Sequence, residues 1–425
     1  MKKRERGLAW VLGMICALSL WSFPACTETN GSLGSEGDGI VESDTAGTEG
    51  DGGRTEPPGD TLADKKRMVL KSLEERFIQP SIRHFVEACG ALLAACQAVS
   101  SSVSDEGIDA ARDAWQATMT QWQMLELVQL GPAGAASSVI GGMDLRDEIY
   151  SWPFKNACRV DQETVEKAYD DVDAFREELI NVRGLDALEL LLFVEGFDNH
   201  CAQNSKLNTS GSWAALSDEE ITAQRMAYAE TLATILLDHA KALENAWTDG
   251  FAEALATAGA GSEVFPTAQD GLNSVSDALF YLDKVTKDMK VAEPAGISEC
   301  DEDSCPETLE SLYAHVSREN VLSNLKGFHA VMVGGLPEFE ERYGFVDLLH
   351  AVDAGDLAEE MLARTDEAIE LVEAVEVSFL EQLTADVEVV RAIHVALKEI
   401  TTLLKTEFLS TFDLEIPQRA ASDND

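Results

Sequence analysis

Apolar residues recur at the spacing of an α-helix along most of the chain from residue 62 to residue 409. No segment shows the convincing alternation of apolar and polar positions that is typical of a strand. A capping box, with Ser217 followed by Glu220, predicts the start of one further helix. The pattern therefore indicates an all-α fold. The predicted helices cover 62–99, 105–130, 162–181, 183–193, a segment from 217, 267–289, 307–333, 355–383 and 385–409.

Residues 183–193, RGLDALELLLF, are nearly all apolar but include two carboxylates. A helix that is apolar all round lies inside a bundle rather than on its surface. Asp186 and Glu189 are three positions apart and share one face of this helix. Buried carboxylates are costly unless they are hydrogen-bonded, paired with a cation or bound to a metal. The two acids therefore predict either a structural ion-pair site or a binding site.

A long connection follows the helix at 105–130. It starts at Gly131-Pro132, which stops that helix, and passes Asp144 and Arg146 before it reaches Trp152-Pro153. Long loops in compact domains are often functional, so we expect this segment to line a site. An alternative stays open, because Arg146 or Arg183 would also be able to neutralise Asp186 or Glu189 in a bidentate pair. The result would be a closed network that binds nothing.

The segment GLDALELLLF resembles the signature helix of imelysin-like proteins, which is written GxHxxE and precedes an apolar run. Trp115, Trp122, Leu130-Gly131-Pro132 and Ser151-Trp152-Pro153 are similar to the family's tryptophan helix, Gly-Pro loop and Trp-Pro turn. The second half of the chain also resembles the family, at Lys290, Glu310-Ser311-Leu312-Tyr313, Ser317 and Asn324. Together the matches span most of residues 64–410. Asp186 stands where the signature has His.

The resemblance implies two similar helical-bundle halves, of the up-and-down four-helix type, that arose by internal duplication. Residues 326–332, KGFHAVM, echo residues 183–189, RGLDALE, and support this implication weakly. The echo has His329 where the first copy has Asp186. One candidate metal site therefore joins Asp186 and Glu189 to His329, although a hydrogen-bonded bundle histidine is the simpler interpretation.

Two functions follow from the resemblance, and a third follows from the acidic surface and loops of the chain. The first is a non-catalytic envelope protein that binds a metal ion or a small ligand near Asp186 and Glu189, with iron acquisition as its biological setting. The ligand-binding set would comprise Asp144, Arg146, Trp152, Asp186, Glu189, Lys290, Glu310, Ser317 and Asn324. The second is a metal-dependent peptidase, the family's historical label. The third is an interaction module that docks another envelope protein.

The chemistry of the residues bears on the first two functions. The chain has no HExxH motif, no phosphate-binding glycine loop and no GxSxG elbow. His84 and Glu87 form an HxxE match, but Ile82 replaces the required glycine, so we treat the match as fortuitous. The cofactor candidates are divalent iron, calcium or zinc. Carboxylate oxygens suit calcium, magnesium, manganese or iron better than catalytic zinc, which commonly has histidine ligands.

The amino terminus predicts export to the cell envelope. Residues 1–25 combine a basic start with a short apolar run, as in a signal peptide. They end at Phe23-Pro24-Ala25-Cys26, which resembles a bacterial lipobox with Cys26 as the lipidated residue. Thr27 after Cys26 favours the outer membrane of a Gram-negative cell by the common sorting pattern. No later stretch is expected to be long and apolar enough to span a bilayer.

Residues 26–63 are acidic and rich in Gly and Ser, which predicts a disordered tether. The remaining length suggests an amino-terminal helical half at 64–210, a carboxy-terminal half at 211–412 and a flexible tail at 413–425. The formal net charge of -45 argues against nucleic acid and anionic lipid surfaces as partners. The membrane is therefore expected to be reached through the lipid alone.

Six of the eight cysteines remain after Cys16 of the signal and Cys26. An oxidising compartment favours disulfides among them. The favoured pairs are Cys158 with Cys201, which would join the two ends of the proposed site, and Cys300 with Cys305. Cys89 and Cys96 lie roughly 10.5 Å apart by helical rise and are expected to be buried thiols.

Overall fold

The computed structural model describes residues 61–415, and within that range the secondary structure is helical without a strand. The all-α prediction is confirmed. The predicted signal peptide, Cys26, most of the tether and the last ten residues lie outside the described residues. The described residues belong to one compact unit, which extends from Glu56 to Asp425.

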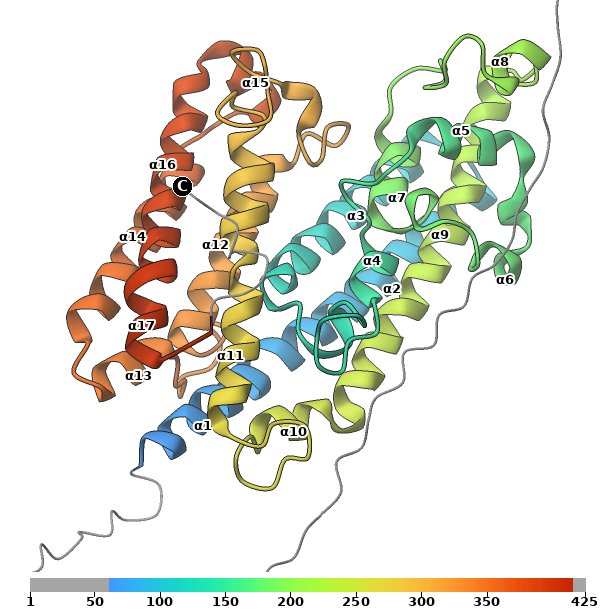
Figure 1. Cartoon of the computed structure of the whole chain (residues 1–425). Helices are drawn as coiled ribbons and strands as arrows, with labels where there is room; N and C mark the ends of the chain where they lie inside the picture. Colours follow the sequence, from blue (N-terminus) through green and yellow to red (C-terminus); the bar gives the residue numbers. More distant parts are fainter. Residues whose placement is uncertain (1–60, 416–425) are drawn as a thin grey trace, which may run out of the picture. The chain divides into compact units, whose positions relative to one another are not determined.

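One set of helices surrounds the predicted signature segment (Figure 1). α1 (Leu62–Leu73), the π-helical turn η1 (Glu74–Ile78) and α2 (Gln79–Ser101) follow one another without a break. α2 packs against α3 (Asp105–Leu125) and α9 (Asp218–Ala246), and α7 (Gly184–Phe193) packs against α3 and α9. The predicted capping box at Ser217 and Glu220 is present at the start of α9.

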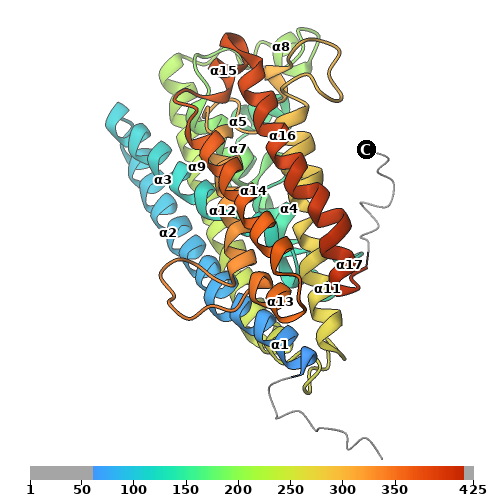
Figure 2. The same cartoon turned by 90° about the vertical axis from the view of Figure 1, so that its left-hand side faces the viewer.

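A second set of helices lies beside the first, in yellow to red (Figures 1 and 2). α12 (Ser317–Val333) packs against α14 (Gly355–Glu373), which packs against α16 (Val387–Leu403). The π-helix η7 (Leu282–Ala292) follows α11 (Ala268–Leu279) and packs on α12 and α16. α12 also packs on α3, so it joins the two sets. The division at residue 211 and the internal duplication stay predictions.

The shorter elements complete the described chain. They are η2 (Glu126–Val128), η3 (Gly131–Ala133), α4 (Leu145–Ile149), α5 (Ala157–Glu166), η4 (Ala168–Asp170), α6 (Val172–Phe175), η5 (Ile180–Val182), α8 (Lys206–Ser210), η6 (Trp247–Phe251), α10 (Ala252–Ala256), η8 (Pro306–Thr308), α13 (Phe345–Ala351), α15 (Phe379–Ala385), η9 (Leu404–Phe408) and α17 (Leu409–Phe412).

Three predicted helices are wrong in extent. The helix predicted at 355–383 is interrupted, because α14 ends at Glu373 and α15 starts at Phe379. The segment 162–181 is not one helix, because α5 ends where Lys167 adopts a left-handed conformation with φ 56° and only short turns follow. The helix predicted at 307–333 starts instead at Ser317, after His315 with φ 59°. A left-handed residue ends a run of helical hydrogen bonds, and apolar spacing alone does not reveal it.

The core is apolar and rich in aromatic rings. Trp115 and Trp122 are fully buried, as expected for core residues on one face of α3. Their indole nitrogens donate to the carbonyl oxygen of Leu185 and to Glu126 Oε1, each at 2.8 Å. Trp115 therefore ties α3 directly to the start of α7.

By length and composition, the helix Leu62–Ser101 is apolar enough to cross a membrane. The expectation that no stretch beyond the signal would be so apolar is wrong by this criterion. Leu73, Phe77 and Phe85 of this helix are fully buried against the other helices. Those contacts are typical of a core helix.

The cysteine predictions are confirmed. Cys158 is bonded to Cys201, and Cys300 is bonded to Cys305. Cys89 and Cys96 are free and buried in α2. The first bridge holds α5 to the loop that follows α7.

Candidate functional site

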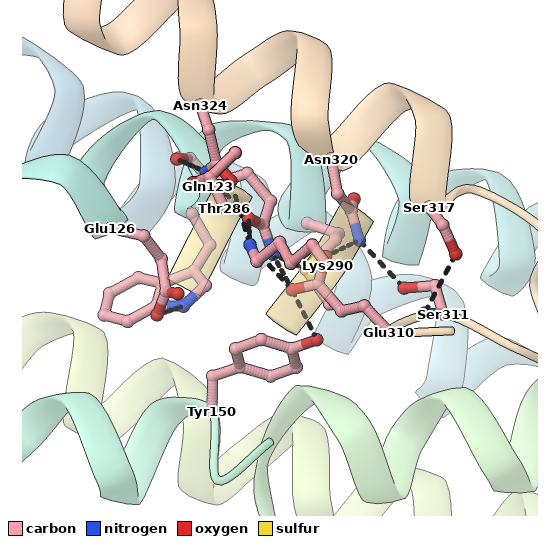
Figure 3. A network of polar contacts seen from close by, with 12 residues as sticks. Gln123, Glu126, Tyr150, Thr286, Lys290, Glu310, Ser311, Ser317, Asn320 and Asn324 are labelled. Atoms are coloured by element: carbon pink, nitrogen blue, oxygen red, sulfur yellow. Dashed lines mark hydrogen bonds and ion pairs between the residues drawn. The ribbon is translucent and has the colours of Figure 1, made fainter. Parts of the chain in front are cut away.

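A buried ion pair lies where the two sets of helices meet. Lys290 on η7 and Glu310, in the loop before α12, have fully buried side chains, and Lys290 Nζ lies 2.9 Å from Glu310 Oε1. The ammonium also donates to Gln123 Oε1 at 2.6 Å and to Asn324 Oδ1 at 3.0 Å (Figure 3). Its three hydrogens therefore have three acceptors.

The Glu310 carboxylate is equally well satisfied. Its Oε1 accepts from Gln123 Nε2 at 2.8 Å and from the Tyr150 hydroxyl at 3.0 Å. Its Oε2 accepts from Asn320 Nδ2 at 2.9 Å (Figure 3). Burial, followed by the charge of Glu310, holds the pKa of Tyr150 well above its usual value, so the phenol is a hydrogen donor.

Asn324 and Ser317 link α12 to this network. Asn324 Nδ2 donates to the backbone oxygen of Gln123 at 2.7 Å and to its Oε1 at 2.9 Å, which fastens α12 to α3. Ser317 Oγ accepts from the backbone N–H of Ser311 at 3.3 Å. The structure therefore brings together Lys290, Glu310, Ser317 and Asn324, as the resemblance implied. Each has protein partners already.

Arg146 lies in a different pair from the one expected. Its Nε is 3.2 Å from Glu126 Oε1, and its Nη1 is 3.1 Å from Asp147 Oδ1. Glu126, fully buried, also accepts from the Tyr281 hydroxyl. The expectation that Arg146 would neutralise Asp186 or Glu189 is wrong. Arg146 serves Glu126, an acid that the apolar pattern did not single out.

Arg183 also pairs elsewhere. Its Nη1 lies 2.7 Å from Oε2 of Glu148, which is on α4. Arg183 therefore pairs with Glu148 and not with the two acids of α7. As residue 183 precedes α7, its side chain lies at the helix start and reaches toward the preceding connection. The bidentate pair proposed for Arg183 with Asp186 or Glu189 is therefore absent.

The Glu189 side chain joins the two sets of helices, because it accepts hydrogen bonds from backbone N–H groups of the second set. Its Oε1 accepts from the N–H groups of Tyr313 and Ala314 at 2.8 and 3.1 Å. Its Oε2 lies 2.9 Å from Lys155 Nζ, and both side chains are largely buried. Glu189 thus receives donors from the loop before α12 and from the connection before α5.

Asp186 has one oxygen with a partner and one without. Its Oδ2 accepts from the Ser151 hydroxyl at 2.7 Å. Its Oδ1 is buried and has no hydrogen-bond partner among the described residues. Burial raises the pKa of Asp186, and the bond from Ser151, the charge of Lys155 and the nearby backbone N–H groups of Asp186 and Ala187 offset this only in part. An unsatisfied buried carboxylate oxygen is the feature that most clearly favours a ligand here.

Lys155 is the cation that sequence reasoning missed. Its Nζ lies 4.7 Å from the centre of the Tyr313 ring, in addition to its pair with Glu189. Burial alone lowers the pKa of Lys155, but Glu189 and then Asp186 hold it above its usual value. The ammonium therefore sits among two carboxylates and an aromatic face. Ser151 belongs to the Ser151-Trp152-Pro153 turn, which resembles the family, whereas no motif includes Lys155.

Two further predicted site residues, and the fortuitous HxxE match, are placed differently from the acid pair. Trp152 is buried, with its ring centre 6.0 Å from Lys290 Nζ, so it covers the ion pair of Lys290. Asp144 is exposed and accepts from the N–H of Ala136 at 2.8 Å, which organises its own loop. His84 and Glu87 are both exposed on α2, in keeping with a fortuitous match.

The proposed metal site with His329 is not formed. His329 lies on a different surface of α12, with its Nε2 3.7 Å from Asp366 Oδ1. Within residues 61–415 no group of three or more His, Cys, Asp or Glu side chains is arranged to hold a metal ion. The predicted metal site of Asp186, Glu189 and His329 is wrong. Helical spacing assigns His329 to a face of its helix but does not show which neighbouring element packs against that face.

Known structures share this fold. One is a candidate iron-regulated protein A precursor from Parabacteroides distasonis, with a TM-score of 0.63, 18% identity and coverage of 82% of this chain and 95% of that one. Another is an imelysin-like protein from Psychrobacter arcticum, with a TM-score of 0.63, 18% identity and coverage of 83% and 97%. At these identities the likeness shows the fold alone. A search of curated proteins finds no match.

The sequence itself matches a family model. The model of the family described as Peptidase_M75, imelysin, matches residues 78–406, which include the helix with Asp186 and Glu189 and the network of Lys290 and Glu310. This match covers most of the chain. The chain therefore belongs to the imelysin family.

Proposed function

We propose that this protein is a non-catalytic component of the cell envelope that binds a metal ion or a small cationic ligand at Asp186 and Glu189. The observation that carries the proposal is the unpartnered, buried Oδ1 of Asp186. Folding has placed this carboxylate in the interior with a donor for only one of its two oxygens, whereas both oxygens of the buried Glu310 carboxylate have donors. Such a defect is costly in a purely structural network.

Lys155 indicates the kind of ligand. Its ammonium already occupies the position beside Glu189 and against the Tyr313 ring, where a carboxylate and an aromatic face favour a cation. A bound cation would contact Asp186 Oδ1 and would displace Lys155 from Glu189. Lys155 lies in the non-helical connection before α5, and its displacement would break the ion pair with Glu189 and the contact with the Tyr313 ring.

Iron is the first candidate among metal ions. Carboxylate oxygens are hard ligands that suit iron, calcium and magnesium. One structural neighbour carries the name iron-regulated protein, which favours iron acquisition as the setting. With two protein carboxylates, the ion would keep water or a chelating small molecule in its other positions.

The test is a titration of the full chain with Fe²⁺, Ca²⁺ and Zn²⁺ by calorimetry, with elemental analysis of the purified protein. The variant Asp186→Asn/Glu189→Gln removes both charges, and Glu163→Gln on α5 removes another buried acid as a control. We expect stoichiometric binding that is lost in the double variant and kept in the control. Equal weak binding by all three proteins would overturn the metal proposal.

A second variant tests the role of Lys155 in cation binding, and the same titration is repeated with organic cations. Lys155→Met removes the internal ammonium but keeps an apolar side chain against Tyr313. We expect the affinity for the bound cation to rise about tenfold or more, because the competitor is gone. Unchanged or weaker binding would mean that Lys155 belongs to the ligand site as a contact and not as a competitor.

The family label keeps a metal-dependent peptidase as the competing proposal. It requires cleavage of a protein substrate that stops on addition of a chelator and in Glu189→Gln. Cleavage that persists in Glu189→Gln would identify a contaminating protease.

A further inference from the structure

Some of the residues that echo the signature helix line a pocket that is separate from Asp186 and Glu189. The pocket has a volume of about 320 Å³ and lies between α12, α14, the end of α3 and the loop after α12. This volume is at the lower end of the range for small-molecule sites, about 300 to 1,000 Å³. Its walls are mainly apolar and come from Met124, Ala330, Leu336, Pro337 and Ile369.

Gly327 explains how the echo forms this pocket. A Cβ at Gly327 would lie 2.7 Å from the backbone oxygen of Met124, so glycine lets α12 approach α3 closely. His329 and Ala330 are then directed to the space beside Met124. Lys326 is one turn earlier on the same face.

The polar groups at the pocket differ in how well they are paired. Lys326 Nζ is 2.9 Å from Glu373 Oε1, and His329 Nε2 is 3.7 Å from Asp366 Oδ1. Both side chains therefore have acidic neighbours.

Arg342 is the exception among the cations of this pocket. Its Nη1 donates only to the backbone oxygens of Gly335 and Leu336, at 3.4 Å each. No carboxylate lies within 4.0 Å of it among the residues that the structure describes. Arg76, Arg83 and Arg225 also form no ion pair among the described residues, so the feature that sets Arg342 apart is its position at the wall of a mainly apolar pocket.

The stem of Arg342 is held in place. A Cβ at Gly335 would lie 3.2 Å from both Cγ and Cδ of Arg342, so the side chain packs tightly on that glycine. A guanidinium held by its stem presents a planar pair of donors that fits a carboxylate. The apolar walls, with the adaptable Met124, fit a hydrocarbon or aromatic body.

We propose that this pocket binds a small amphipathic carboxylate, with its carboxylate on Arg342 and its apolar body against Met124, Leu336 and Ile369. The occupant is a free small molecule of the size of a medium-chain fatty acid. This site is independent of the function proposed for Asp186 and Glu189.

The experiment is a calorimetric titration of the full chain with octanoate, beside octylamine and octanol, which share the chain length but not the charge. We expect octanoate to bind, octylamine to show no binding and octanol to bind more weakly. Arg342→Gln should weaken octanoate binding about tenfold, since a charge-assisted pair is lost. Arg364→Gln, a surface arginine that pairs with Glu367, should leave the binding unchanged.

A second measurement locates the ligand without any change to the pocket. In protein labelled with [¹³C-methyl]methionine, octanoate should shift the Met124 resonance, which is identified by its loss in Met124→Leu. The proposal is overturned if octanoate fails to bind, if octylamine binds equally well, if Arg342→Gln binds as tightly as Arg364→Gln, or if the Met124 resonance does not move.

Discussion

The buried pair of Lys290 and Glu310 can be used to measure how much a buried ion pair contributes to the free energy of unfolding. Their atoms are 2.9 Å apart and both side chains are fully buried. Lys326 and Glu373 are also 2.9 Å apart, but each is about half exposed. The two pairs share their separation, but the first is buried within a hydrogen-bond network and the second is exposed to solvent.

We expect Lys290→Met to lower the free energy of unfolding by about 3 to 5 kcal/mol, because it leaves the Glu310 carboxylate buried without its cation. Lys326→Met should cost no more than about 1 kcal/mol, because water screens the exposed pair. Denaturation in urea measures both. Equal losses in the two variants would contradict this interpretation, and Lys290→Met/Glu310→Gln should recover part of the loss.

Asp186 makes stability depend on pH. Burial raises its pKa in the folded protein above the value in the unfolded chain. Between the two pKa values the folded state binds more protons, so the contribution of Asp186 to the free energy of unfolding falls as pH rises. The stability of the wild type relative to Asp186→Asn should therefore decline from about pH 4 upward and level off above the folded pKa.

Urea denaturation of both proteins at a series of pH values checks this prediction. A relative stability that rises with pH would mean that a cation, not burial, dominates at Asp186. A bound metal ion would have this effect, so the same series in the presence of Fe²⁺ would show whether the slope reverses.

At the scale of elements, α7 depends on how it starts. Gly184, its first residue, has φ +80°, and a Cβ there would lie 2.8 Å from the backbone oxygen of Ile149. The same Cβ would lie 3.3 Å from Asp186 Oδ1. Gly196 has nearly the same conformation, with φ +77°, and no atom within 4 Å of its hypothetical Cβ.

Gly196→Ala should lose about 1 to 2 kcal/mol from the left-handed conformation alone. Gly184→Ala should lose clearly more, because it adds a contact with backbone that has little room to move. It should also weaken binding at Asp186, whose carboxylate it would shift. Thermal denaturation and the cation titration test both effects, and equal losses of stability would show that the Ile149 contact relaxes freely.

At the scale of the whole molecule, the candidate site around Glu189 and the network around Asn324 both depend on contact between the two sets of helices. Glu189 on α7 accepts from Tyr313 and Ala314, which precede α12, and Asn324 on α12 donates to Gln123 on α3. A ligand that displaces Lys155 from Glu189 would therefore change contacts in both sets of helices.

The lipid anchor is a whole-molecule proposal that concerns residues outside the described range. We expect the full chain to be found in the membrane fraction and its amino-terminal peptide to carry acyl chains on Cys26. Cys26→Ser should release the protein into the soluble fraction. Mass spectrometry of the mature protein tests this prediction. An unmodified amino terminus at a residue other than Cys26 would contradict the lipid anchor and indicate ordinary cleavage of the signal peptide.

The helical class, both disulfides and the burial of Trp115 and Trp122 were predictable from the sequence. Apolar periodicity reports which face of a helix is buried, and this is a local property. The extent of α5 and the start of α12 were not predictable in this way, because Lys167 and His315 adopt left-handed conformations without the usual glycine. The four second-half residues Lys290, Glu310, Ser317 and Asn324 were found through the family resemblance and do lie together.

The sequence by itself determined that Asp186 and Glu189 would be buried on one helical face, since a carboxylate within an apolar run has nowhere else to go. Only the tertiary structure decided their partners. Lys155 and Tyr313 are 34 and 124 residues from Glu189 in the chain, while Arg146 and Arg183, the expected partners, are paired with Glu126 and Glu148. Charge pairing depends on distances of a few ångströms between side chains on different elements, and those distances are set by how the helices pack.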